Sequence, residues 1–115
     1  MQEIVNIQTL DKYCKQNNIE NIDLLKMDVE GHELDVLRGG GRFLRSHEAS
    51  TISFEVGPCN IDSHTYFKDY YYFINEIGGY KLFRITPSGY FIQIKNYREM
   101  YEQFQTSIFV AEKDK

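Results

Sequence analysis

The feature that most constrains the fold of this chain is a nearly continuous apolar run over residues 22–29 (IDLLKMDV). Its length suits a single β-strand, and the lack of polar alternation favours a strand that is covered on both faces. The chain must turn at Glu30-Gly31 directly after it. Because side chains alternate along a strand, one face is expected to carry the following residues: Ile22, Leu24, Lys26, Asp28 and Glu30.

Lys26 is unusual inside such an apolar strand, because burying an ammonium group without a partner is energetically costly. The sequence therefore predicts a carboxylate partner for it. Asp28 is one candidate, and Glu55 in the next predicted strand, residues 51–56 (TISFEV), is the other.

The remaining periodicity predicts an α/β sheet. Helices are expected over residues 10–17, with Thr9 as N-cap, over 32–44, where glycines 39–41 interrupt, and over 66–77. Further strands are expected over residues 3–8, 80–85, 90–95 and 107–112. Helices between the early strands indicate parallel strands with helical crossovers. The turn residues 86–89 (TPSG) predict a hairpin and an antiparallel C-terminal end.

Length and composition describe an ordinary soluble domain. The 115 residues are expected to form one domain, residues 1–115, and the net charge of −4 disfavours nucleic acid and anionic membranes as partners. Cys14 and Cys59 lack metal-ligand spacing and are expected to be free thiols. The N-terminus lacks a secretory pattern, and no apolar run approaches the roughly 18 residues of a membrane span, so a cytoplasmic location is expected.

Both early strands carry acidic side chains at their carboxyl ends, where an open α/β sheet binds ligands. A cluster is therefore expected at that edge, formed by Lys26, Asp28, Glu30, His32 and Glu55. Such a cluster could deprotonate a hydroxyl, hold a divalent cation or bind a cationic ligand. The alternative is structural: Lys26 and an acid form an inert buried pair, while Glu30 and Glu33 favour the start of the next helix through its dipole.

Several segments together carry a resemblance to a known family. They are Thr9-Leu10-Asp11, the decapeptide of residues 22–31 with Lys26-Met27-Asp28-Val29-Glu30-Gly31 at its end, Glu33, Val36-Leu37, Gly39, Phe54-Glu55 and Gly79-Tyr80. This pattern is similar to that of FkbM-type methyltransferases. The resemblance implies a class I methyltransferase (Rossmann-like) sheet and S-adenosylmethionine as cofactor. It also implies methyl transfer to oxygen, with a small-molecule, sugar or lipid hydroxyl as acceptor.

The resemblance also implies roles for individual residues. Asp28 and Glu30 would flank the site of methyl transfer, with His32 or Glu55 as alternative bases. Asp28 near the methyl group, and Lys26 indirectly, would contact the cofactor. A cation held by Asp28, Glu30 and Glu55 is an alternative that the same residues allow.

The matching segments correspond to the C-terminal half of the family's domain, and residues 1–115 contain no glycine-rich cofactor loop. The strand that bears Asp28 is therefore expected to be a sheet edge, which is prone to pair with another strand. A second copy of the chain or a complementary chain is expected to use this edge. The alternative function is a non-catalytic module for oligomerisation or partner binding.

Overall fold

The computed structural model describes residues 7–46, 49–102 and 106–114, which form a mixed α/β fold. Its elements follow in the order α1 (Leu10–Gln16), β1 (Ile22–Lys26), α2 (Glu33–Gly39), α3 (Gly41–Arg45), β2 (Ala49–Val56), α4 (Cys59–Ser63), α5 (Phe67–Ile77), β3 (Tyr80–Ile85), β4 (Phe91–Ile94), a 3-10 turn η1 (Glu99–Tyr101) and β5 (Ser107–Lys113). The predicted α/β class is confirmed.

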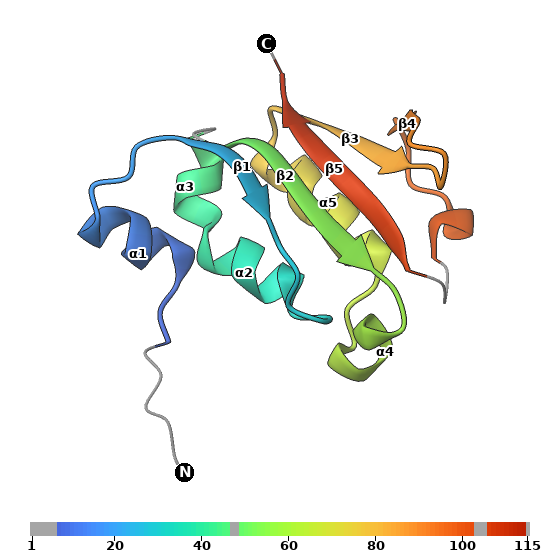
Figure 1. Ribbon diagram of the computed structural model, residues 1–115, viewed down its shortest axis with the longest axis horizontal. Coiled ribbons are helices and arrows are strands. Elements are labelled where there is room, and N and C mark those ends of the chain that lie inside the picture. Colours follow the sequence, from blue (N-terminus) through green and yellow to red (C-terminus); the bar gives the residue numbers. More distant parts are fainter. Residues whose placement is uncertain (1–6, 47–48, 103–105, 115) are drawn as a thin grey trace.

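The strands form one five-stranded sheet in the order β1-β2-β5-β3-β4. β1 and β2 are parallel and are connected through α2 and α3, whereas β5 runs antiparallel to both β2 and β3. β3 and β4 form the predicted antiparallel hairpin. In Figure 1, α5 lies behind β2 and β5, with α2 and α3 beside it. The helical crossover and the antiparallel C-terminal end are thus both as predicted.

One part of the core lies between the sheet and α5 and is built from aromatic rings. Phe54 of β2 is fully buried, and its ring centroid lies 4.8 Å from that of Tyr70 and 5.8 Å from that of Phe109. Phe67, at the first turn of α5, stacks on Phe109 at 4.4 Å. The buried residues of α5 recur at every third or fourth position, as expected for a helix with one side on the core: Phe67, Tyr70, Ile74 and Ile77.

The first strand differs from its prediction in two respects. β1 is the predicted edge strand and, within the described chain, pairs with β2 alone, but it ends at Lys26 and not at residue 29. Leu24 on its outer face is 58% exposed, so the expectation of a strand covered on both faces is wrong. The reason is that the helices cover only the face that carries Leu25 and the following Met27, which belong to the core.

Smaller differences concern element boundaries. The helix predicted over residues 32–44 is two helices that meet at Gly40, where an added Cβ would lie 2.7 Å from Leu10 Cδ2 of α1. The glycines therefore interrupt the helix, and the lack of a side chain at Gly40 allows α1 to pack closely against this point. α4 was not predicted, and β2 begins at Ala49. Most of the strand expected over residues 3–8 lies outside the described residues; Ile7 and Gln8 have no regular structure.

The segment Thr9-Leu10-Asp11 has a structural role that its sequence did not reveal. The Thr9 hydroxyl accepts the Lys12 N–H at 3.1 Å and caps α1, as predicted. The Asp11 carboxylate reaches the first turn of α3, where it accepts the Phe43 N–H at 2.8 Å and the Arg42 N–H at 3.1 Å. Asp11 thus caps a helix that is distant in sequence and ties α1 to it.

Asp11→Ala is expected to lower the free energy of unfolding by about 1–2 kcal/mol, because two N–H groups of α3 lose their acceptor. Asp11→Asn keeps one oxygen acceptor and should lose roughly half as much. Urea denaturation of the three proteins measures both effects. Equal stability of wild type and Asp11→Ala would contradict the capping role.

Candidate functional site

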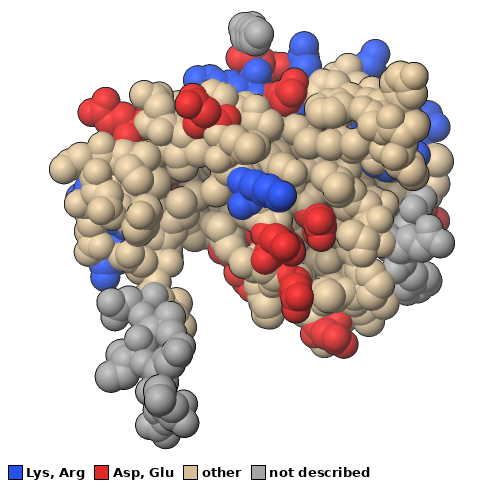
Figure 2. Space-filling model, viewed as in Figure 1, with Lys and Arg blue, Asp and Glu red and all other residues tan. Residues whose placement is uncertain are grey.

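A pocket of 180 Å³ opens where β1 and β2 end. Asp28, Glu30 and Glu55, predicted as site residues, all line it. The pocket is completed by Gly31, Glu33, Gly57, Pro58, Cys59, Asn60 and Thr106. Figure 2 shows acidic side chains gathered below the ends of these two strands. The expected meeting of acids from two neighbouring strand ends is therefore observed, while their roles in catalysis stay predictions.

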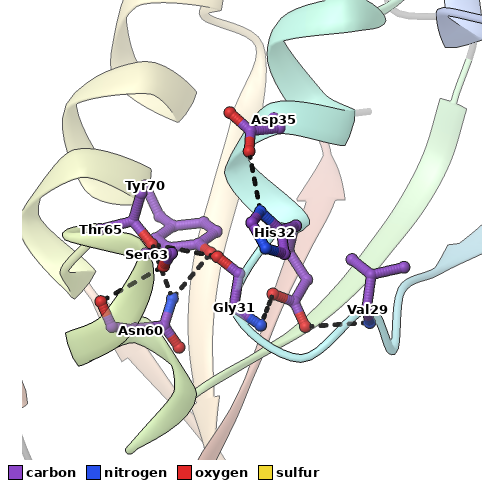
Figure 3. A network of polar contacts seen from close by, with 9 residues as sticks. Val29, Gly31, His32, Asp35, Asn60, Ser63, Thr65 and Tyr70 are labelled. Carbon is purple, nitrogen blue, oxygen red and sulfur yellow. Dashed lines mark hydrogen bonds and ion pairs between the residues drawn. The ribbon is translucent and has the colours of Figure 1, made fainter.

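Two residues of the predicted cluster do not line this pocket. Lys26 is exposed, and within the described part of the chain it forms no ion pair. The buried pair with Asp28 or Glu55 is wrong, because the outer face of β1 is open to solvent and the ammonium group stays hydrated. His32 lies at the start of α2, where its Nδ1 is 3.1 Å from Asp35 Oδ2 on the surface (Figure 3).

The loop that carries Asp28 and Glu30 is held from inside by Glu33. This side chain is only 1% exposed. Its Oε2 accepts the Gly31 N–H at 3.0 Å and its Oε1 accepts the Val29 N–H at 3.3 Å (Figure 3). Glu30 has a left-handed backbone with φ of 49°, which turns the chain sharply between these two bonds. Glu33 therefore fixes the loop's shape through its backbone and leaves Asp28 and Glu30 exposed at the pocket.

Gly31 sits where this loop meets the start of α4. Its φ of 98° favours glycine, and an added Cβ would lie 2.5 Å from the backbone oxygen of Cys59. The Thr65 hydroxyl also donates to the Gly31 carbonyl at 3.2 Å. The two walls of the pocket, one following β1 and one following β2, are thus in direct backbone contact.

The second wall is organised by Asn60, which is 3% exposed. Its Nδ2 donates to Thr65 Oγ1 and to the Tyr70 hydroxyl oxygen, both at 3.0 Å (Figure 3). Its Oδ1 accepts the Gly57 N–H at 3.0 Å. Burial raises the pKa of Tyr70 above its ordinary value, so its hydroxyl stays protonated. Asn60 thereby links the turn after β2 to the core helix α5.

The sequence reasoning missed these two organising residues. Glu33 was read only as a favourable charge at a helix start, and Asn60 was not singled out. An available signal for Asn60 was its place after Gly57-Pro58, because asparagine commonly closes turns by bonding to nearby backbone. Glu33 gave no comparable signal, since its inward direction depends on how the loop folds back.

Acidic side chains such as those of the pocket can bind a metal ion where several of them are placed around one point. Among residues 7–46, 49–102 and 106–114, no group of three or more His, Cys, Asp or Glu side chains is placed to hold a metal ion. Asp28, Glu30 and Glu55 line one pocket without converging on a common point as ligands would. Cys14 and Cys59 form no disulfide. No helix in the described residues is long and apolar enough to cross a membrane.

The acidic pocket lies at the carboxyl ends of two parallel strands, which is where open α/β sheets bind their ligands. Residues 2–82 match the Methyltransferase FkbM domain, so the chain belongs to the FkbM methyltransferase family. Over 36 residues it is 47% identical to "2-O-methyltransferase NoeI" of Sinorhizobium fredii (strain NBRC 101917 / NGR234). That alignment spans 31% of this chain and 15% of the relative. No solved structure matches the chain.

Proposed function

We propose that this chain takes part in S-adenosylmethionine-dependent methyl transfer to a hydroxyl group of a small molecule, sugar or lipid. The observation that carries the proposal is that Asp28, Glu30 and Glu55 line one pocket at the ends of β1 and β2. The family match and the 2-O-methyltransferase named among the relatives support methyl transfer and an oxygen acceptor.

The pocket suits one end of the cofactor. Its acidic lining complements the positive charge of a sulfonium group. Its 180 Å³ falls below the roughly 300–1,000 Å³ of pockets that enclose whole ligands of this size. We therefore assign to this chain the wall beside the sulfonium and the acceptor. We assign the rest of the cofactor site to polypeptide outside residues 1–115, called the complementary polypeptide below.

The reaction needs little from the protein beyond positioning and proton removal. When bound, S-adenosylmethionine would supply the methyl group, which the acceptor oxygen would take as the carbon–sulfur bond breaks. The hydroxyl proton passes to a carboxylate of the pocket, for which Asp28, Glu30 and Glu55 are the candidates. His32 is a poorer candidate, because it does not line the pocket and contacts Asp35.

The edge of β1 is the proposed place for the complementary polypeptide. A parallel strand added there would end beside Asp28, so a glycine-rich loop following that strand would face the acidic pocket. The exposed Leu24 on β1 also favours a partner at this edge. The alternative function, a non-catalytic oligomerisation module, draws on the same observation.

Titration with methyl-¹³C-labelled S-adenosylmethionine, followed by NMR, tests the assignment. We expect weak binding to the isolated chain, which loses about threefold to fivefold in affinity for each of Asp28→Asn and Glu55→Gln. S-adenosylhomocysteine lacks the sulfonium charge and should bind equally to wild type and variants. Glu20→Gln, an exposed acid outside the pocket, is the control for net charge.

Two results would contradict the enzyme assignment. One is that the pocket variants bind both ligands as wild type does. The other is that neither ligand binds, while the solution mass shows a dimer that Leu24→Lys on β1 dissociates. This second result would establish the oligomerisation module instead.

A further inference from the structure

A second pocket, of 590 Å³, lies between α1 and α3. Ile19, which precedes β1, and Ser46, which follows α3 and leads toward β2, both line it. It therefore lies toward the amino ends of the strands, whereas the acidic pocket lies at their carboxyl ends. Its volume falls within the range of about 300–1,000 Å³ that is typical of small-molecule sites. Nothing in the proposed methyl transfer uses it.

The rim of this pocket is positively charged, although the chain as a whole carries a net charge of −4. Lys12 and Lys15 project from α1 and Arg42 from α3, and all three line the pocket. None of them forms an ion pair with any residue that the structure describes. Asp11 is the only acid of the lining, and both of its oxygens accept backbone N–H groups of α3.

The floor of the pocket is apolar. Cys14 and Phe43 are buried there, and Ile19 is half-buried beside them. The Thr9 hydroxyl stands at the rim and accepts the Lys12 N–H. No described residue accepts its proton, which can therefore be donated to a ligand oxygen. The pocket therefore combines a cationic rim, a hydroxyl donor and an apolar floor.

We propose that this pocket binds a phosphomonoester whose phosphate is attached to a small apolar or aromatic body. Three cations against one carboxylate leave a formal charge of +2, which a phosphate dianion balances. Arg42 can donate hydrogen bonds to two phosphate oxygens from its planar guanidinium group, and each lysine contributes a positively charged ammonium group. The apolar body would displace water from the floor formed by Cys14, Ile19 and Phe43.

Calorimetric titration with phenyl phosphate and with inorganic phosphate tests this proposal at low ionic strength. We expect saturable binding of phenyl phosphate, tighter than that of inorganic phosphate because only the former covers the apolar floor. The double variant Lys12→Gln/Arg42→Gln should weaken phenyl phosphate binding about tenfold. Both substitutions are at exposed side chains, and circular dichroism checks that the fold is unchanged.

The control is Lys95→Gln/Lys68→Gln, which removes the same charge from exposed positions outside this pocket. Vesicles of phosphatidylcholine containing phosphatidic acid, a lipid phosphomonoester, distinguish the source of the ligand. Binding of the vesicles that is lost in Lys12→Gln/Arg42→Gln would support the site and assign the phosphate to a lipid headgroup. The proposal is overturned if no phosphomonoester binds, or if the control variant weakens binding as much as the pocket variant does.

Discussion

Gly31→Ala is expected to destabilise the protein by about 3 kcal/mol, with the loss seen as a lower urea midpoint at neutral pH. Part of the loss arises because alanine is strained at a φ of 98°. The larger part arises because the new Cβ would lie 2.5 Å from the backbone oxygen of Cys59. Neither atom belongs to a flexible side chain, so the loop after β1 and the start of α4 must move apart.

Gly89→Ala is the control that separates the effect of backbone strain at positive φ from the effect of the close contact between residue 31 and Cys59. Gly89 lies in the turn between β3 and β4 with a φ of 91°, and an added Cβ there would meet no atom within 4 Å. Its substitution should therefore cost only about 1 kcal/mol. If the two alanine variants were equally stable, the close approach of Gly31 to Cys59 would contribute nothing, and the packing of the two pocket walls would differ from that described.

Glu33→Ala is expected to lower the free energy of unfolding by a similar amount, about 3 kcal/mol. The substitution removes a buried carboxylate that accepts the N–H groups of Val29 and Gly31, and it leaves a cavity under the loop. The loop bearing Asp28 and Glu30 should loosen even in the fraction of molecules that remains folded. Urea denaturation measures the first effect, and hydrogen exchange of the two amides measures the second.

Glu33→Gln is the matched variant, because it keeps the size of the side chain and one acceptor oxygen. Its NH₂ group would face one of the two backbone N–H groups, so a loss of about 1–2 kcal/mol is expected. Unchanged exchange of the Val29 and Gly31 amides in Glu33→Ala would show that the carboxylate does not hold the loop.

The location of the acidic pocket was predictable from the sequence, because it follows from where two neighbouring strands end. Asp28 follows β1, and Glu55 lies near the carboxyl end of the neighbouring parallel strand β2. Parallel strands end at the same edge of a sheet, so the meeting of these two residues in one pocket needed only the element order. The solvent exposure of Lys26 was not predictable in this way. Its apolar neighbours suggested burial, whereas β1 is an edge whose outer face has no layer over it in the described chain.

The sequence by itself determined where most helices and strands lie, and which family the chain belongs to. It did so because periodicity, turn residues and the Lys26–Gly31 motif are local signals. Only the tertiary structure decided that Glu33 turns inward beneath the loop and that Asp11 caps α3. It also decided that α1 and α3 enclose a cationic pocket. Each of these features depends on contacts between residues that only the folded chain brings together. A backbone N–H group needs an acceptor, but the local sequence does not indicate which distant side chain provides it.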